Sequence, residues 1–225
     1  FDVIIISPGI DKKKCGLSKF IKKNDYKTIT ELDIFYLNNL KNKKITITGT
    51  NGKSTTAKLI YEIIKKNNKD VRLGGNIGKP LLFEKNIKKN TLFVIEASSY
   101  QIEYSKYFRS DIAAILNISP DHLERHQTFS KYINAKLKLI KNQNKNDLTF
   151  INKSNLKFLS NKKINSKIIK VKKFPQETNK IKNQYFKNLN NLNNLSFAIS
   201  ICKKLGLNKK KTEIAINSFK GLPYR

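Results

Sequence analysis

Short apolar runs alternate with longer amphipathic stretches along most of this chain. The runs are rich in isoleucine and valine and only a few residues long, which is typical of buried strands. They predict strands over 2–6, 45–48, 71–73, 91–96, 111–117, 147–151 and 167–171. The longer stretches repeat their apolar positions every three or four residues, as one face of a helix does. They predict helices at about 15–23, 53–67, 99–107, 129–142, 191–205 and 209–219.

The alternation of strands with helices predicts the fold class. Long spacings between strands require crossover connections, so we expect an α/β fold with a mostly parallel, doubly wound sheet. A domain boundary is expected near 35–43, where "FYLNNLKNKK" leads into the second run of strands. The lysine- and asparagine-rich segment 161–189 predicts strand fragments and loops at the periphery. Because the strand at 2–6 has no neighbour before it, we expect the chain to be a fragment.

Length and cysteine content narrow the class of protein. With 225 residues the chain can bury a real core as one large or two small domains. No apolar run approaches the roughly 18 residues of a membrane-spanning helix, and the start carries no secretory signal pattern. Cys15 and Cys202 lie far apart and lack metal-ligand spacing, which favours inert thiols in a reducing compartment. We therefore expect a cytoplasmic protein with no membrane partner.

The net charge of +30 raises the question of a nucleic-acid partner. Almost all of the excess is lysine, whereas base and phosphate recognition favours the arginine fork. The lysines are scattered through every segment, and heavy use of lysine, asparagine and isoleucine is what an A/T-rich genome encodes. We interpret the charge as mainly compositional and expect no nucleic-acid partner. Functional binding of a polyanion is the alternative.

The joint between the strand at 45–48 and the helix at 53–67 carries the strongest chemical signal. Its residues are Gly49, Thr50, Asn51, Gly52, Lys53, Ser54, Thr55 and Thr56. Glycines let successive backbone N–H groups point at one anion, and the helix N-terminus adds partial positive charge. Lys53 would bind the β- and γ-phosphates, and Ser54 or Thr55 would offer a hard oxygen to Mg²⁺. We expect a nucleotide triphosphate site, although the pattern G-x-x-x-x-G-K-[ST] is incomplete because Ile47 replaces its first glycine; a tight turn with a chance lysine is the alternative.

Two further strands end on polar residues. The strand "TLFVIE" ends at Glu96, and "DIAAILNIS" leads to Asp121 and His122. Ligands of open α/β sheets bind beyond the carboxyl ends of the strands, so these residues should gather beside Lys53. Glu96 and His122 are candidate magnesium ligands, although His is a softer donor than this ion usually takes. The alternatives are a helix-capping role for Glu96 and an ordinary loop histidine.

The predicted helix at 129–142 places a lysine on its apolar face. That face consists of Phe129, Tyr132, Ile133, Leu137 and Ile140. Lys136 falls on the same face by helical spacing. It is either a lysine that extends to solvent from the edge of the stripe or a desolvated amine with a lowered pKa, which reacts in its neutral form.

Several motifs together resemble the Mur ligases, ATP-dependent amide-forming enzymes of peptidoglycan synthesis. They are "SPGI" (7–10), "TELDIF" (30–35), "GTNGKSTT" (49–56), "GGNIGKPL" (74–81), "EASSYQIE" (96–103), "LNISPDHLERH" (116–126), "YINAKLKL" (132–139) and "GLPYR" (221–225). The similarity runs through essentially the whole chain. The phosphate loop is common to the superfamily, whereas "GGNIG" and "SSYQIE" resemble the branch that adds D-glutamate.

The resemblance implies a domain plan and a reaction. Residues 1–37 would be the remnant of an N-terminal, Rossmann-like UDP-binding domain, 38–221 the central ATP-binding domain, and 222–225 the hinge to an amino-acid-binding domain. The implied enzyme is an ATP-dependent acid–amino-acid ligase and mostly a monomer. Its substrates would be UDP-N-acetylmuramoyl-L-alanine, D-glutamate and ATP, and it would use two Mg²⁺ ions and an acyl-phosphate intermediate.

The resemblance also assigns roles to individual residues. Lys53 and the loop 49–56 would hold the phosphates. Ser54 and Glu96 would serve the nucleotide magnesium, and His122 with a carbamylated Lys136 (N6-carboxylysine) the second ion. Asn76 and Ser98 match positions that touch the muramoyl substrate, Asn191 and Asn194 match adenine-side positions, and Arg225 matches the hinge arginine. Catalysis would rest on Lys53, Lys136, His122 and Glu96.

Three positions depart from the family pattern, namely Ala97, Asn190 and Tyr224. They weaken the analogy for the adenine contacts and the hinge but leave the phosphate and metal chemistry unchanged. Another member of the superfamily, such as a diamino-acid-adding ligase or a folylpolyglutamate synthase, is the alternative among enzymes. A basic P-loop protein that binds nucleic acid is the alternative outside them.

Overall fold

The computed structural model describes residues 1–172 and 181–222. Its centre is a six-stranded sheet of order β4-β5-β3-β6-β7-β8 in which every neighbouring pair is parallel. The strands are β3 (Lys44–Thr48), β4 (Val71–Gly75), β5 (Leu92–Glu96), β6 (Ile112–Ile115), β7 (Leu148–Asn152) and β8 (Lys167–Val171). The α/β class and the parallel sheet predicted from the sequence are confirmed.

Eight α-helices lie within the described residues. They are α1 (Ser18–Lys23), α2 (Glu31–Asn38), α3 (Lys53–Lys66), α4 (Ser99–Tyr104), α5 (Leu123–His126), α6 (Phe129–Lys141), α7 (Leu189–Lys204) and α8 (Lys209–Asn217). Short 3-10 helices occur at Asp25–Lys27, Leu81–Phe83, Lys153–Leu159 and Gln184–Phe186. All six predicted helices are present, whereas α2 and α5 were not predicted. None of the described helices is long and apolar enough to cross a membrane.

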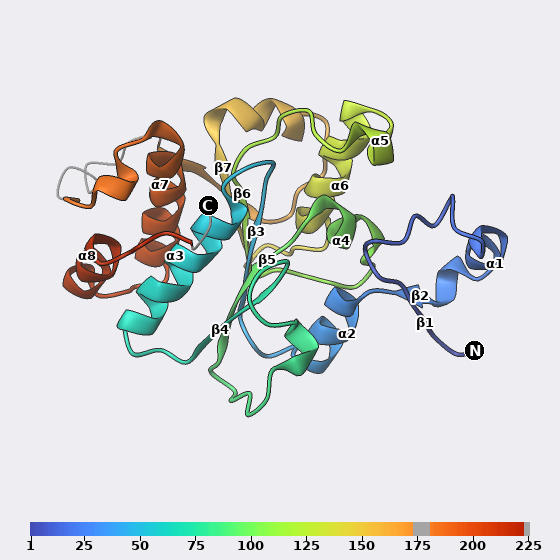
Figure 1. Cartoon of the computed structure of the whole chain (residues 1–225), viewed down its shortest axis with the longest axis horizontal. Helices are drawn as coiled ribbons and strands as arrows, with labels where there is room; N and C mark the ends of the chain where they lie inside the picture. Colours follow the sequence, from blue (N-terminus) through green and yellow to red (C-terminus); the bar gives the residue numbers. More distant parts are fainter. Residues whose placement is uncertain (173–180, 223–225) are drawn as a thin grey trace.

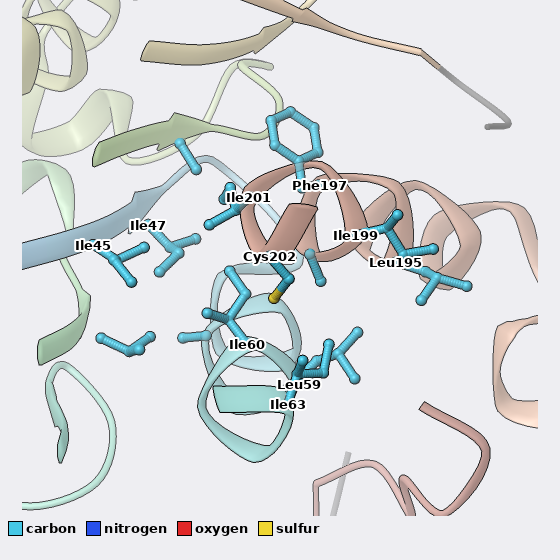
Figure 2. Close-up of a cluster of buried hydrophobic side chains, with 14 of the residues drawn as sticks. Ile45, Ile47, Leu59, Ile60, Ile63, Leu195, Phe197, Ile199, Ile201 and Cys202 are labelled. Carbon is cyan, nitrogen blue, oxygen red and sulfur yellow. The ribbon is translucent and has the colours of Figure 1, made fainter. Parts of the chain in front are cut away.

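Helices α3, α7 and α8 cover one face of the sheet (Figure 1). Figure 2 shows the core of this layer, where side chains of β3, α3 and α7 interdigitate. Ile45 and Ile47 point from β3 toward Ile60 of α3, and Ile201 of α7 packs above them. All four side chains are fully buried. Because β3 lies in the middle of the sheet and runs straight into the loop before α3, this core fixes the loop at both ends.

The opposite face is covered by α2, α4 and α6. Leu32 and Phe35 of α2 are buried there, and the Phe35 ring meets Phe93 of β5 edge-to-face at 4.7 Å. Helix α2 begins with a capping box between Thr30 and Asp33. The boundary expected at residue 37 therefore falls inside a helix that packs on the central sheet.

A second, two-stranded sheet precedes α2. Its strands β1 (Ile4–Ile5) and β2 (Thr28–Ile29) pair in parallel, and α1 connects them. Figure 1 shows this small unit beside the α2 and α4 side of the main sheet. At the other end of the chain, β8 forms the outer strand of the main sheet, in agreement with the peripheral place expected for part of 161–189. Residues 173–180 of that segment lie outside the described residues.

The register of the three central strands brings their carboxyl ends to one edge. Ile47 of β3 pairs with Glu96 of β5, and Thr48 of β3 pairs with Ile115 of β6. The loops that follow these strands therefore start side by side. They carry the residues that the sequence predicted to form a site.

Candidate nucleotide and metal site

The loop between β3 and α3 wraps closely against its neighbours. Gly52 precedes α3 in the left-handed region, with φ 82°, and a Cβ atom there would overlap the side-chain oxygen of Asn194 on α7. Only glycine combines this backbone angle with this close approach. Gly52, the N-cap residue, has no side chain with which to cap the first turn of α3, where Lys53 and the buried Ser54 stand. Such a helix start is a favourable place for a phosphate group.

The segment after β6 holds the other side of the loop. The Asn117 side chain accepts a hydrogen bond from the Asn51 backbone N–H at 2.8 Å and donates one to the Asn51 carbonyl at 2.9 Å. The Asn117 carbonyl accepts from the Thr50 N–H at 2.9 Å, and the Ser119 N–H donates to Thr50 Oγ1 at 3.0 Å. Asn117 and Ser119 were not predicted as site residues, because a polar residue just after a strand is typical of any loop.

Lys136 lies directly behind the loop. Its side chain is buried with 2% exposure, and Nζ donates to the Gly49 carbonyl at 2.8 Å. The Tyr132 ring lies 4.5 Å from Nζ, and the Tyr132 hydroxyl is 3.0 Å from Thr50 Oγ1. A lysine extending to solvent from the edge of the stripe is therefore excluded. Tyr132, predicted only as an apolar position, also contacts the loop.

Burial sets the protonation of this amine. Desolvation, together with the positive charge of Lys53, lowers the pKa of Lys136 from its ordinary value of 10.5 to about 7, while the Asp121 carboxylate opposes the change. A lysine with that pKa is largely neutral above pH 7 and can act as a nucleophile. The Lys53 amine donates to the Thr50 carbonyl at 2.7 Å, so it folds over the same loop.

Glu96 ends β5 with 1% exposure. Its Oε1 accepts from Asn76 Nδ2 at 3.1 Å, and its carbonyl accepts from the Asn76 N–H at 2.9 Å. Its Oε2 is buried and has no hydrogen-bond partner among the described residues. A buried carboxylate oxygen is costly without a partner, which points to a ligand at this position.

Ser98, two residues on, caps α4. Its hydroxyl accepts from the Gln101 N–H at 3.2 Å, and Gln101 Oε1 accepts from the Ser98 N–H at 3.0 Å. This capping box makes the helix-capping alternative for Glu96 wrong. The structure thus places Asn76, Glu96 and Ser98 in succession at the ends of β4 and β5.

His122 is more peripheral than the other predicted residues. It precedes α5 in the left-handed region, with φ 52°. Its ring nitrogens lie 3.4 Å from Asp121 and 3.5 Å from Glu124, and 46% of the side chain is exposed. The Tyr132 ring lies 6.5 Å from the His122 ring and 4.5 Å from Lys136 Nζ. The structure brings His122 to the correct edge with its nitrogens directed at carboxylates.

The first turns of α7 supply the asparagines. Asn194 is buried against Gly52. Asn191 Nδ2 donates to the Tyr185 carbonyl at 3.0 Å. Asn194 therefore lies against the loop between β3 and α3. Arg225 lies outside the described residues.

No three His, Cys, Asp or Glu side chains of the described residues group closely enough to hold a metal ion. A metal at this edge therefore needs other oxygen ligands as well. Ser54, the unpartnered Glu96 oxygen and phosphate oxygens are of the kind that Mg²⁺ prefers. The unmodified Lys136 amine is not a ligand that Mg²⁺ prefers.

A parallel sheet with a glycine-rich loop, a lysine and a buried carboxylate at adjacent strand ends defines a nucleotide-binding α/β protein. The family model described as "Mur ligase middle domain" matches residues 47–218. The chain belongs to the Mur ligase family.

Related sequences carry a common name. A UDP-N-acetylmuramoylalanine–D-glutamate ligase from Lachnoclostridium phytofermentans is 43% identical over 152 residues, covering 67% of this chain and 33% of the relative. The protein of the same name from Caldicellulosiruptor bescii is 32% identical over 247 residues, covering 99% of this chain and 54% of the relative. The chain thus spans between a third and about half of the length of these relatives.

Solved structures share the fold. A UDP-N-acetylmuramate:L-alanyl-gamma-D-glutamyl-meso-diaminopimelate ligase from Neisseria meningitides superposes with a TM-score of 0.70 at 17% identity, over 98% of this chain and 79% of that one. The MurF ligase of Thermotoga maritima in complex with ADP gives a TM-score of 0.62 at 17% identity, over 99% of this chain and 64% of that one. At these identities the likeness shows the fold alone.

Proposed function

We propose that the complete gene product joins D-glutamate to UDP-N-acetylmuramoyl-L-alanine at the expense of ATP. The relatives with this name support the substrates, since one of them aligns with 99% of the chain. The observation that carries the proposal is that three features share one edge of the sheet. The phosphate loop follows β3, the unpartnered Glu96 oxygen ends β5, and the buried Lys136 amine reaches the loop from α6.

The proposed reaction has two steps. The terminal carboxylate of the muramoyl substrate attacks the γ-phosphorus of ATP, and ADP leaves as the acyl phosphate forms. The amine of D-glutamate then attacks the acyl carbon, phosphate leaves, and the amine loses a proton as the amide forms. Phosphoryl transfer depends mostly on positioning and charge neutralisation, which are the properties of this edge.

The phosphate loop supplies most of the positioning. Lys53 turns from the Thr50 carbonyl, 2.7 Å away, to the phosphates when nucleotide binds. The loop 49–52 keeps its shape because Asn117 holds Asn51 at both backbone groups. Thr55 and Thr56 continue the first turn of α3 behind Ser54. Loop amides that are fixed before binding cost little to order around an anion.

The described residues suit one magnesium site well. Ser54 and Glu96 would hold the ion bound to the nucleotide, and the Glu96 Oε2 atom is the hard oxygen that such a site needs. When bound, magnesium neutralises phosphate charge. A second ion would be held by His122 and by Lys136 once this amine has become a carboxylate-like group.

The surroundings of Lys136 support its carbamylation. The neutral amine attacks carbon dioxide, an N–C bond forms, and the nitrogen loses a proton, which leaves N6-carboxylysine. Burial that lowers the pKa to about 7 supplies the neutral amine. The new carboxylate would also place a negative charge beside Lys53.

Substrate contacts complete the proposal. Asn76 and Ser98 face the muramoyl substrate at the ends of β4 and β5. Asn191 and Asn194 serve the adenine side from α7, and Arg225 acts from the hinge. We assign 1–37 to the UDP-binding domain, with α2 as the helix that packs its end on the central sheet, 38–221 to the ATP-binding domain and 222–225 to the hinge. We place the enzyme in the cytoplasm as a monomer.

Calorimetric titration of ATP with Mg²⁺ into this chain tests the nucleotide site. Lys53→Ala removes a charge from the phosphates and should weaken binding by about 3 kcal/mol, on the order of a hundredfold. Lys58→Ala is the matched control, since Lys58 lies on the same helix and pairs with Glu62 at 2.8 Å. Unchanged binding in Lys53→Ala, or equal loss in both variants, would contradict the role of the loop.

A further inference from the structure

Arg125 of α5 ties the N-terminal unit to the edge that carries the site. Its Nη2 donates to the Ile10 carbonyl at 2.7 Å and to the Pro8 carbonyl at 3.2 Å, and its Nη1 donates to the Gly9 carbonyl at 3.4 Å. Three successive carbonyl groups thus converge on one guanidinium. Within the described residues, every hydrogen bond between residues 7–11 and the chain beyond residue 30 comes from Arg125.

Two tyrosines of α4 hold the guanidinium in place. Nη2 also donates to the Tyr104 hydroxyl at 3.0 Å, and the Tyr100 ring lies 4.8 Å from the guanidinium carbon. The Tyr104 hydroxyl in turn accepts from the Lys12 N–H at 3.3 Å. With 14% side-chain exposure, Arg125 is far less open than a surface arginine. A largely buried arginine with this many partners fixes the groups it binds.

The position of α5 gives this contact a consequence for the site. Arg125 stands three residues after His122, and the Tyr100 ring that it covers also lies 5.1 Å from the His122 ring. Helix α4, which carries both tyrosines, starts directly after Ser98. One side chain therefore links residues 8–11 to the two segments that present His122 and Ser98.

We propose that Arg125 is a positioning residue, which holds residues 8–11 in place at the rim of the muramoyl-substrate site. This inference rests on the proposed function, because it concerns a UDP-linked substrate that reaches from the N-terminal unit to the phosphate loop. A lysine at this position could not replace the arginine, because a single ammonium group lacks the planar fork that spans three carbonyls.

The kinetic test uses Arg125→Lys in the complete gene product. The KM for UDP-N-acetylmuramoyl-L-alanine should rise about tenfold or more, while the KM for ATP stays within about twofold. Arg109→Lys is the matched control, since Arg109 is half-buried and binds Asp147 at 2.9 Å near the opposite ends of the strands. Its two KM values should stay unchanged. The proposal would be overturned if the two KM values of Arg125→Lys changed equally or if neither changed. It would also be overturned if Arg109→Lys showed the same change as Arg125→Lys.

Hydrogen exchange without any ligand provides an independent result. In Arg125→Lys, the amides of Lys12, Lys14 and Cys15 should exchange about tenfold faster, because their partners Tyr104 and Asp11 lose their anchor. Amides of β3 should not change. If the wild-type enzyme is inactive, the proposed function is contradicted. The role of Arg125 in the substrate site is then contradicted too, even if the amides of Arg125→Lys exchange faster. Unchanged exchange would contradict the anchoring itself.

Discussion

At the scale of single residues, burial decides what Lys136 and Glu96 can do. Spacing alone placed Lys136 on an apolar helix face, but spacing could not distinguish a lysine that reaches solvent from one enclosed by Tyr132 and Gly49. Glu96 was predicted because a carboxylate ending an apolar strand needs a partner. The sequence could not show that Asn76 binds one oxygen of Glu96 and leaves the other without a partner.

The titration of Lys136 predicts a pH dependence of stability. The unfolded chain keeps the ordinary pKa of 10.5, and the folded protein has about 7, so the unfolded state binds more protons between these values. The free energy of unfolding of the wild type should therefore rise with pH in this window, by at most about 1.4 kcal/mol per pH unit. Lys136→Met should lack this contribution. Urea unfolding of both proteins at pH 7 and pH 9, in buffers free of carbon dioxide, measures it; parallel pH profiles would contradict the lowered pKa.

At the scale of elements, seven strands and six helices followed from periodicity, whereas strand β2 and helices α2 and α5 did not. Helix α5 has four residues, too few to show a repeat. Helix α2 was missed although "TELD" carries its capping box, because the segment was interpreted as a boundary. The contacts of Asn117 and Arg125 were also missed, since both side chains bind backbone groups that lie far away in the sequence.

Asp33 shows how such a contact joins two elements. Its Oδ1 accepts from the N–H groups of Lys106, Tyr107 and Phe108, and its Oδ2 accepts from the N–H and hydroxyl of Thr30. The buried carboxylate thereby fixes α2 to the segment between α4 and β6. Five donors on one buried carboxylate make it difficult to replace.

Asp33→Asn should destabilise the chain by about 2–3 kcal/mol. The new NH₂ group would take the place of one carboxylate oxygen, and it cannot accept the hydrogen bonds that this oxygen accepts. Asp25→Asn is the control: Asp25 pairs with Lys12 at 3.1 Å but is largely exposed, so its loss should cost less than about 1 kcal/mol. Urea unfolding of the two variants compares them directly. An equal, small cost for both would mean that Asp33 does not hold α2 in place.

At the scale of the whole molecule, the sheet order places the loops after β3, β5 and β6 side by side. The sequence predicted this arrangement because parallel strands present their carboxyl ends at one edge. The place of the N-terminal unit was not predictable, since it depends on α2 and on long-range contacts such as those of Arg125 and Tyr104. Family membership rests on the match over residues 47–218, and the reaction remains our proposal.

The most direct test of that reaction is phosphate release by the complete gene product with ATP, Mg²⁺ and UDP-N-acetylmuramoyl-L-alanine. D-glutamate, L-glutamate and meso-diaminopimelate are offered in turn. We expect release with D-glutamate only. Release with another of these amino acids would keep the fold and contradict the assigned substrate. Absence of release with all three would contradict the proposed ligase activity.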